Sequence, residues 1–170
     1  MPCSPLSVQM TRAQNGNMGG IAIPAEVREL LESPNYLHLA TLRDDGSPRN
    51  WVVWVGIEGE RLLICTDDST WKAKDMRRNP RVSASVVDLA NPYRMAAIQG
   101  QVVEARPDPD CSYMDPISMK YTSAPFPHRG PGRVCFVIAV LNAGARSLNW
   151  LSHRPQITGM RPRASSIDGL

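Results

Sequence analysis

The sequence lacks the short motifs that mark many enzymes with catalytic side chains or phosphate loops. It contains no HExxH, no GxSxG, no glycine-rich phosphate loop and no Rossmann fingerprint. These absences disfavour zinc proteases, serine hydrolases, P-loop enzymes and dinucleotide-binding folds. The three histidines, His38, His128 and His153, are scattered along the chain. We therefore predict no metal site, and we name no catalytic residue.

Cysteine, aromatic residues and long apolar runs are also scarce. The four cysteines include no CxxC motif and no Cys/His pair at zinc spacing. Cys65 and Cys135 lie in apolar runs, which favours buried reduced thiols. No run is long enough to span a membrane, and residues 1–20 lack the apolar core of a signal peptide. We therefore predict a cytoplasmic protein without a membrane span.

The charge balance argues against a nucleic-acid partner. The net charge is only +3 in 170 residues, and aromatic residues make up 6% of the chain. So small a basic excess does not by itself indicate nucleic acid, and no base-stacking platform is visible. We predict no nucleic-acid binding, and the local clustering of basic residues becomes more informative than the total charge.

The hydrophobic pattern is that of a mainly β protein with a few short helices. Ile23, Val27, Leu30 and Leu31 fall at helical spacing and predict a first helix. Alternating or β-branched segments then predict six strands. They lie at Tyr36–Leu42, Asn50–Ile57, Arg61–Thr66, Arg81–Val87 and Met95–Glu104, and within residues 134–150. A further helix is expected from Ser69, capped by Asp68 or Ser69, to Arg78, and Gly100 is a candidate bulge.

Short strands joined by hairpin turns favour a small antiparallel barrel in one domain. We place this domain at residues 21–150. Residues 1–20 are rich in Ser, Pro, Asn and Gly and are predicted to be a flexible N-terminal tail. Residues 151–170 show no periodicity and are predicted to be a weakly ordered C-terminal tail.

One segment, STWKAKDMRRNPR at residues 69–81, carries five basic residues and one acid. It follows a strand and begins a predicted helix, where free backbone N–H groups attract anions. Its charges wrap the helix rather than forming one stripe, so a solvated surface helix remains the alternative. The strand-to-helix context favours a ligand that carries a phosphate.

The neighbouring segment PRNWVVWV, residues 48–55, contains two tryptophans three positions apart. Because a strand has a period of two, Trp51 and Trp54 cannot lie on one face of a regular strand. One is expected to face the barrel interior and the other to face outward, where a subunit, a ligand ring or the N-terminal helix covers it.

In their order and spacing, these segments resemble the pyridoxamine 5'-phosphate oxidase-like split β-barrel family. The resemblance covers roughly residues 23–140, and its most specific parts are DGSPR, S-x-x-KAKDMRRNPRVSASVVD and KYTSAPFP. Within the family, the chain is most similar to the deazaflavin (coenzyme F-420)-dependent reductases of the flavin/deazaflavin oxidoreductase superfamily, B group. This likeness implies an FMN-binding split barrel that forms a homodimer with cofactor sites at the subunit interface.

The resemblance also implies where the cofactor binds. The ring is expected along Asn50–Trp54 and the phosphate end near Thr66, Ser69, Lys72 and Lys74, while the loop with Lys120, Tyr121 and Arg129 approaches from the partner subunit. The full set of expected cofactor-binding residues is Asn50, Trp51, Val52, Val53, Trp54, Thr66, Ser69, Lys72, Lys74, Asp75, Arg78, Lys120 and Arg129.

Two residues depart from the family pattern. Asp75 stands where the family commonly has Asn, and a carboxylate repels a phosphate. We therefore expect Asp75 to pair with Lys72 or Arg78 across a helical turn. Trp51 is bulky for its strand position and narrows the substrate space.

The function implied is transfer of a hydride from reduced F-420 to a small conjugated acceptor, such as an enone, a quinone-like compound or a tetrapyrrole. A cofactor that carries the hydride explains the missing catalytic motifs. The cations Arg77, Arg78 and Arg81 suit the long acidic tail of F-420 better than FMN. The alternatives are an FMN-dependent oxidase or reductase on the same fold, or a non-catalytic protein that binds a cofactor or haem. The acceptor and any proton donor are left unnamed.

Overall fold

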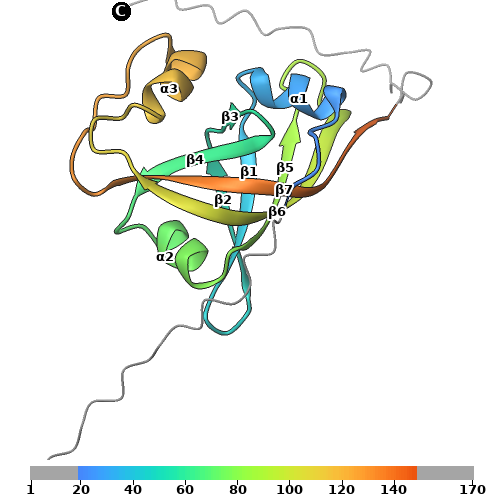
Figure 1. The fold of residues 1–170 in the computed structure, drawn as a ribbon. Coiled ribbons are helices and arrows are strands. Elements are labelled where there is room, and N and C mark those ends of the chain that lie inside the picture. Colours follow the sequence, from blue (N-terminus) through green and yellow to red (C-terminus); the bar gives the residue numbers. More distant parts are fainter. Residues whose placement is uncertain (1–18, 149–170) are drawn as a thin grey trace, which may run out of the picture.

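The computed structural model describes residues 19–148 of the 170-residue chain, so both predicted tails lie almost wholly outside the described residues. Three helices and seven strands occur in this part (Figure 1). In chain order they are α1 (Ala25–Glu32), β1 (Leu37–Leu42), β2 (Pro48–Val53), β3 (Gly56–Glu58), β4 (Arg61–Asp67), α2 (Trp71–Arg78), β5 (Arg81–Val87), β6 (Arg94–Pro107), α3 (Met114–Thr122) and β7 (Arg133–Ser147).

The strands form one antiparallel sheet in the order β2-β1-β5-β6-β7-β4-β3. The two strands at the ends of this order, β2 and β3, are consecutive in the chain and are separated only by Trp54 and Val55. The sheet must therefore curl until its two edges meet, which is the arrangement of a split barrel. The predicted mainly β split-barrel class is confirmed.

Helix α1 packs on the sheet with its apolar stripe. Val27, Leu30 and Leu31 are buried, and they join the main core cluster formed by inward-facing residues of the strands. The helix begins after Pro24, whose ring suits a helix start, and it ends before Pro34. No helix among residues 19–148 has the length and apolar character needed to cross a membrane.

Strand β4 and the first half of β7 are buried on both faces. Leu62 and Ile64 of β4 point into the main core, whereas Leu63 and Cys65 contact a second cluster. This second cluster also contains Met114 and Ile117 of α3 and Cys135 and Val137 of β7. The alternation follows from the two-residue period of a strand. It places α3 against the outer face of the β4–β7 pair, opposite the barrel interior.

The segment predicted as one strand at residues 50–57 is in fact two strands on opposite edges of the sheet. The backbone N–H of Val55 donates to the Tyr121 hydroxyl (3.3 Å), and its carbonyl accepts from Lys120 Nζ (2.6 Å). Gly56 then passes so close to α3 that an added Cβ would lie 2.8 Å from Ile117 Cγ1. Because of these contacts, the chain stops pairing with β1 after Val53 and begins to pair with β4 at Gly56.

The predicted helix start at residue 69 is also corrected. The Asp67 carboxylate accepts the backbone N–H of Ser69 (2.9 Å), so the chain is still in a turn there. Thr70 is the N-cap, and its hydroxyl accepts from the backbone N–H of Ala73 (3.4 Å). Helix α2 therefore begins at Trp71, one residue later than a cap at Ser69 predicts and two later than a cap at Asp68 predicts.

Strands β6 and β7 are longer than predicted and pair along most of their length. The pairing shifts register between Gln99 and Gly100, which confirms an irregularity at Gly100, although the residue without a partner is Leu141 of β7. A Cβ at Gly100 would lie 2.7 Å from Ile138 Cγ2 and 3.0 Å from the Ala139 carbonyl oxygen. The close approach of the two backbones therefore requires glycine at this position.

We expect Gly100→Ala to lower the free energy of unfolding by about 1–3 kcal/mol, because the new methyl group meets buried atoms that have little room to move. Gly144→Ala is the matched control on the same pair of strands, since a Cβ there has no atom within 4 Å. It should change stability by less than about 0.5 kcal/mol. Urea unfolding of both variants measures the difference, and equal stabilities would contradict the packing argument.

Candidate functional site

The site lies where β4 ends and β7 begins, between α2 and α3 (Figure 1). Here a cavity of about 330 Å³ opens beside the end of β2. A volume of this size falls in the range of small-molecule sites. Its lining residues are Tyr36, Val52, Val53, Trp54, Cys65, Thr66, Lys72, Met114, Phe126 and Arg133. None of these ten residues is a carboxylate.

Two cations mark one end of the cavity. Lys72 comes from the first turn of α2, and Arg133 is the first residue of β7. Burial lowers the pKa of the Lys72 ammonium, and the like charge of Arg133 lowers it further. The Arg133 guanidinium lies over the Phe126 ring at 4.6 Å, and its buried Nε has no hydrogen-bond acceptor within residues 19–148. This end of the cavity is therefore electropositive, and one of its hydrogen-bond donors, Arg133 Nε, lacks an acceptor.

Aromatic rings mark another side of the cavity. Trp54 stacks on Tyr121 with ring centroids 5.0 Å apart and an interplanar angle of 5°. Phe126 meets Trp54 edge-on at 6.4 Å, and Tyr36 stacks on Tyr121 at 5.8 Å. The cavity therefore combines apolar rings with positive charge, which suits a planar ligand that bears an anionic group.

The Tyr121 hydroxyl holds this aromatic cluster in place. It donates to the Asn35 carbonyl (2.7 Å) and accepts from the backbone N–H of Val55 (3.3 Å). Burial raises the pKa of Tyr121, so the group stays protonated. Because both hydrogen bonds go to backbone atoms, the hydroxyl fixes the position of Trp54 rather than facing a ligand.

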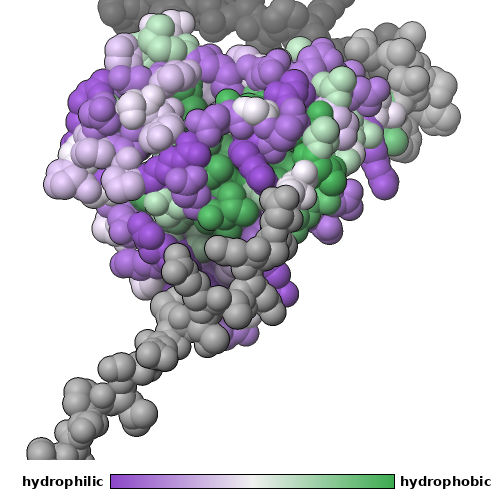
Figure 2. Space-filling model, in the orientation of Figure 1, coloured by the Kyte–Doolittle hydropathy of each residue, from purple (hydrophilic) through white to green (hydrophobic). Residues whose placement is uncertain are grey.

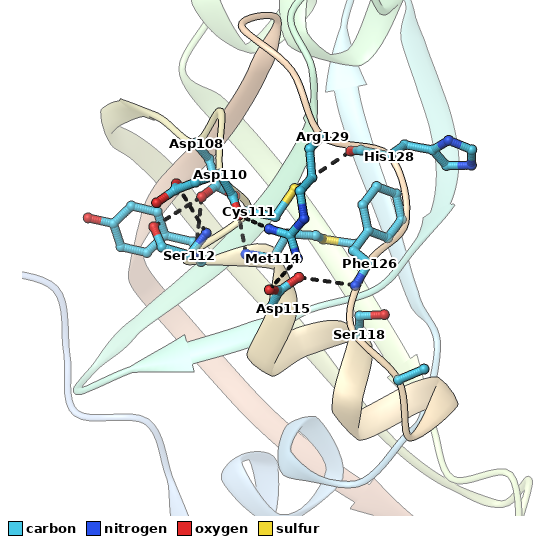
Figure 3. A network of polar contacts seen from close by, with 12 residues as sticks. Asp108, Asp110, Cys111, Ser112, Met114, Asp115, Ser118, Phe126, His128 and Arg129 are labelled. Atoms are coloured by element: carbon cyan, nitrogen blue, oxygen red, sulfur yellow. Dashed lines mark hydrogen bonds and ion pairs between the residues drawn. The ribbon is translucent and has the colours of Figure 1, made fainter.

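A network of polar contacts ties α3 to the loop that carries Phe126 (Figure 3). Buried Asp108 accepts the backbone N–H groups of Tyr113 (3.0 Å) and Met114 (3.1 Å) at the start of α3. Asp115 accepts the N–H of Phe126 (3.0 Å) and pairs with Arg129 (2.7 Å). The two carboxylates thus hold one wall of the cavity against the helix.

A match to a protein-family model shows which family the chain belongs to. The family model for pyridoxamine 5'-phosphate oxidase matches residues 23–146, which is most of the chain.

The chain belongs to the pyridoxamine 5'-phosphate oxidase family.

Similar solved structures agree with this assignment to the oxidase family. An F-420 reductase is 32% identical with a TM-score of 0.66, and the match covers 72% of this chain and 98% of that chain. An FAD-binding protein from Mesorhizobium loti is 21% identical with a TM-score of 0.58, covering 74% and 95% of the two chains. A pyridoxamine 5'-phosphate oxidase-related, FMN-binding protein from Nostoc punctiforme is 14% identical with a TM-score of 0.55, covering 72% and 82%.

The likeness to the last two proteins shows the fold alone, because their identities are low. A search of curated proteins found no match.

In this member of the oxidase family, five of the thirteen predicted cofactor-binding residues line the cavity. They are Val52, Val53, Trp54, Thr66 and Lys72. Trp51 and Trp54 do lie in different surroundings: the Trp51 indole N–H donates to the Thr41 hydroxyl (3.1 Å), whereas Trp54 stacks on Tyr121. Trp51 stays near the cationic end, since Lys72 Nζ lies 5.4 Å from its ring.

The other predicted residues on β2 and α2 point elsewhere. Asn50 is exposed on the edge strand β2, and Ser69 is held by Asp67. Lys74 is exposed and lies over the Trp71 ring at 5.1 Å. Arg78 forms an ion pair with Asp44. The basic segment therefore contributes one cation, Lys72, to the cavity.

Asp75 is buried beneath the site, with 1% of its side chain exposed. It accepts a hydrogen bond from the Thr41 hydroxyl (2.9 Å) and pairs with Arg49 (3.3 Å). Of the two expected partners, Arg78 forms a longer ion pair with Asp75 (3.9 Å), whereas Lys72 forms none among the described residues. Because Thr41 also accepts from Trp51, the carboxylate links β1, β2 and α2, and it does not line the cavity.

Lys120 and Arg129 contact their own chain away from the cavity. Lys120 Nζ donates to the carbonyls of Leu31 (2.7 Å) and Val55 (2.6 Å) and lies at a separate cavity of about 560 Å³ between α1, β3 and α3. Burial lowers the pKa of Lys120 to about 8. Arg129 is engaged by Asp115, as described above. The predicted contribution of this loop to a partner's site remains a prediction.

Sequence reasoning missed half of the lining: Tyr36, Cys65, Met114, Phe126 and Arg133. Cys65 and Cys135 face each other across β4 and β7, and both are free thiols. Their mutual hydrogen bond and burial raise the pKa of Cys65, so the thiol adds no charge to the cavity. Of these five residues, Phe126 could have been found from the sequence, because it lies in the KYTSAPFP motif that supports the family resemblance.

We expect Asp75→Asn to lower the free energy of unfolding by about 2–3 kcal/mol, because it leaves the half-buried Arg49 without its carboxylate. Asp68→Asn is the matched control, since Asp68 lies in the turn before α2, is 45% exposed and pairs with Arg77 of that helix at the surface. The control should cost less than about 1 kcal/mol. Urea unfolding compares the two variants. Equal losses in the free energy of unfolding would show that Asp75 stabilises the fold no more than a surface acid does.

Proposed function

We propose that this protein is an oxidoreductase of the flavin/deazaflavin kind that binds coenzyme F-420 and reduces a small conjugated acceptor. The observation that carries the proposal is the composition of the cavity at the β4–β7 junction. It combines aromatic rings, two cations and a threonine hydroxyl, and no carboxylate lines it. This is the donor set expected for a planar, phosphate-bearing cofactor.

The residues present fit such a group. The orphaned Nε of Arg133 shows that the cationic end has unused hydrogen-bonding capacity for an anion. Thr66 and Lys72 supply a hydroxyl and an ammonium at the same end. Trp54 and Phe126 supply aromatic surface, and their rings meet edge-on with centroids 6.4 Å apart.

When bound, reduced F-420 supplies the hydride, and the protein supplies binding, orientation and electrostatics. Trp54 presents a face held rigid by its stack on Tyr121. Phe126 and Met114 exclude water from the outer side of the cavity. Lys72 neutralises negative charge at the phosphate end. None of these tasks needs a catalytic triad or a metal, which agrees with the motif-poor sequence.

The preference for F-420 rests on the likeness to an F-420 reductase at 32% identity. The extra cations invoked from the sequence give it less support than expected, because Arg77 pairs with Asp68 (2.7 Å) and Arg78 with Asp44. A cavity with only two cations at its edge also suits the single phosphate of FMN. An FMN-dependent oxidase or reductase is therefore the second candidate.

Assembly as a homodimer is part of the proposal. Val52 lines the cavity and yet is 64% exposed, and Trp71 at the start of α2 is 60% exposed. Large apolar side chains left open beside a ligand cavity suit burial by a second subunit.

Titration of the purified full-length protein with F-420, followed by the coenzyme's fluorescence, tests the proposal. We expect saturable binding at tens of micromolar or below, and consumption of reduced F-420 when a conjugated acceptor is added. FMN titrated in parallel distinguishes the second candidate. Tight binding without turnover across a broad acceptor panel would favour a non-catalytic binding protein, and the absence of binding to both coenzymes would refute the proposed function.

Charge reversal on α2 tests the position of the phosphate end. Lys72→Glu should weaken binding of the coenzyme about tenfold or more, because a charged hydrogen bond is replaced by repulsion in a partly buried site. Lys74→Glu is the matched control two residues away. It should weaken binding less than about threefold, because Lys74 is exposed over Trp71 and its charge is screened by water and salt. Equal losses would show that the phosphate end lies elsewhere.

A further inference from the structure

A second cavity, larger than the one at the β4–β7 junction, opens between α1, β3 and α3. Its volume is about 560 Å³, and the three elements that surround it lie at one end of the barrel (Figure 1). The two cavities have no lining residue in common. The second one also has the size of a small-molecule site, and the proposed function gives it no role.

The inner surface of this second cavity is apolar and comes from three different elements. Leu31 of α1, Leu63 of β4 and Ile117 of α3 line it and are buried in the fold. Ile57 of β3 adds a partly buried side chain. These side chains are held by the two core clusters, so the cavity offers fixed apolar surface to a ligand.

Three of the four charged residues that line the second cavity have partners of opposite charge. Arg28 of α1 pairs with Glu60 (2.7 Å) and with Glu32 (3.8 Å), and Glu58 of β3 pairs with Arg106 (2.8 Å). The side chains of Glu32 and Glu58 are 61% and 49% exposed. Water and salt therefore screen these two carboxylates, and their effect on a ligand deeper in the cavity is small.

Lys120 is the fourth charged residue, and it forms no ion pair within residues 19–148. Its Nζ donates to the carbonyls of Leu31 (2.7 Å) and Val55 (2.6 Å) and lies 4.8 Å from the centre of the Tyr121 ring. An ammonium has three N–H groups, so these two hydrogen bonds leave one donor. Burial lowers the pKa of Lys120 to about 8, and the charge of Glu32 opposes this more weakly. The charge is thus partly desolvated, and no acid in the described part of the chain compensates it.

We propose that the cavity between α1, β3 and α3 is a second ligand site, which takes a small apolar molecule that carries one carboxylate. Lys120 binds the carboxylate, while Leu31, Ile57 and Ile117 cover the apolar part. This site goes beyond the proposed function, because neither the ring cofactor nor its acceptor uses these residues. A carboxylate is favoured over a neutral head group, because hydrogen bonds between charged groups are about twice as strong as neutral ones. An ammonium on the ligand would be repelled by Lys120.

Binding of octanoate and octanamide to the full-length wild type tests the charge preference directly. The two probes share one alkyl chain and differ in the charge of the head group. Calorimetry at pH 7 should show one site per chain, with octanoate bound about tenfold more tightly than octanamide. Equal affinities, or no saturable binding of octanoate, would overturn the inference.

The affinity for octanoate should also depend on pH with a defined sign. Below pH 8 Lys120 is mostly protonated, and a bound carboxylate raises its pKa further. The affinity should therefore be constant near pH 7 and fall about tenfold between pH 7 and pH 9, as the free protein loses this proton. Octanamide should show no such fall. A flat octanoate profile would contradict the role of Lys120.

The other titratable groups around Lys120 do not produce this profile. They are Arg28 and Glu32 of α1, Glu58 of β3, and Tyr113 and Tyr121 at the two ends of α3. Carboxyl, guanidinium and phenol groups ordinarily keep their charge state between pH 7 and 9. A fall in affinity over this range therefore reports the ammonium.

Two variants test where octanoate binds. Lys120→Met removes the ammonium and keeps a long apolar side chain, so it should weaken octanoate about tenfold or more and octanamide less than about threefold. Lys72→Glu is the matched variant in the other cavity, and it should bind octanoate as the wild type does. Loss of binding in Lys72→Glu and not in Lys120→Met would place octanoate in the first cavity and overturn the inference. If Lys120→Met does not fold, the wild-type ligand pair and pH series still decide the question.

The coenzymes separate this inference from the proposed function. Saturation with F-420 or FMN, whichever the protein binds, should change the affinity for octanoate by less than about threefold, because the cavities share no lining residue. Direct competition would overturn the second site while the proposed function stands. If neither coenzyme binds, the proposed function fails, and the octanoate measurements still decide whether the second site exists.

Discussion

The antiparallel pairing of β4 with β7 is the constraint on which the rest of the structure depends. Seven residues of β4, from Arg61 to Asp67, pair in register with β7, from Ala139 back to Arg133. Because side chains alternate along each strand, this pair supplies the barrel core on one face and the support for α3 on the other. The cavity forms where the pairing stops, so any slip of register would dismantle both clusters and the site together.

Some charged groups around the site form hydrogen bonds or ion pairs within the described residues, and others do not. The carboxylates of Asp75, Asp108 and Asp115 all accept hydrogen bonds that hold backbone segments or neighbouring side chains. None of the three lines the cavity, so Lys72 and Arg133 are the charged side chains in its lining. On the face shown in Figure 2, hydrophilic residues frame apolar ones over the sheet, as expected for a small domain whose strands carry the core.

Much of the fold was predictable because it follows local periodicity. The first helix, the strands at residues 37–42, 61–67 and 81–87, and the irregularity at Gly100 all agree with the sequence pattern. The division of residues 50–57 was not predictable, because it depends on Tyr121 and Lys120, which are more than sixty positions away. Likewise the charge run on α2 lies beside the candidate cavity, but Arg78 and Arg77 form ion pairs with Asp44 and Asp68 and do not line it.

The sequence by itself determined the class of structure and placed a basic segment at the end of the molecule where the cavity lies. Alternating apolar residues specify strands, and a hydroxyl-rich turn before a basic helix specifies a cationic helix start, because both effects act within a few residues of the chain. Only the tertiary structure decided which charges remain free. Pairing is a matter of distance between groups remote in sequence, and it buried Asp75 against Arg49 while leaving Arg133 beside Lys72 without an acid.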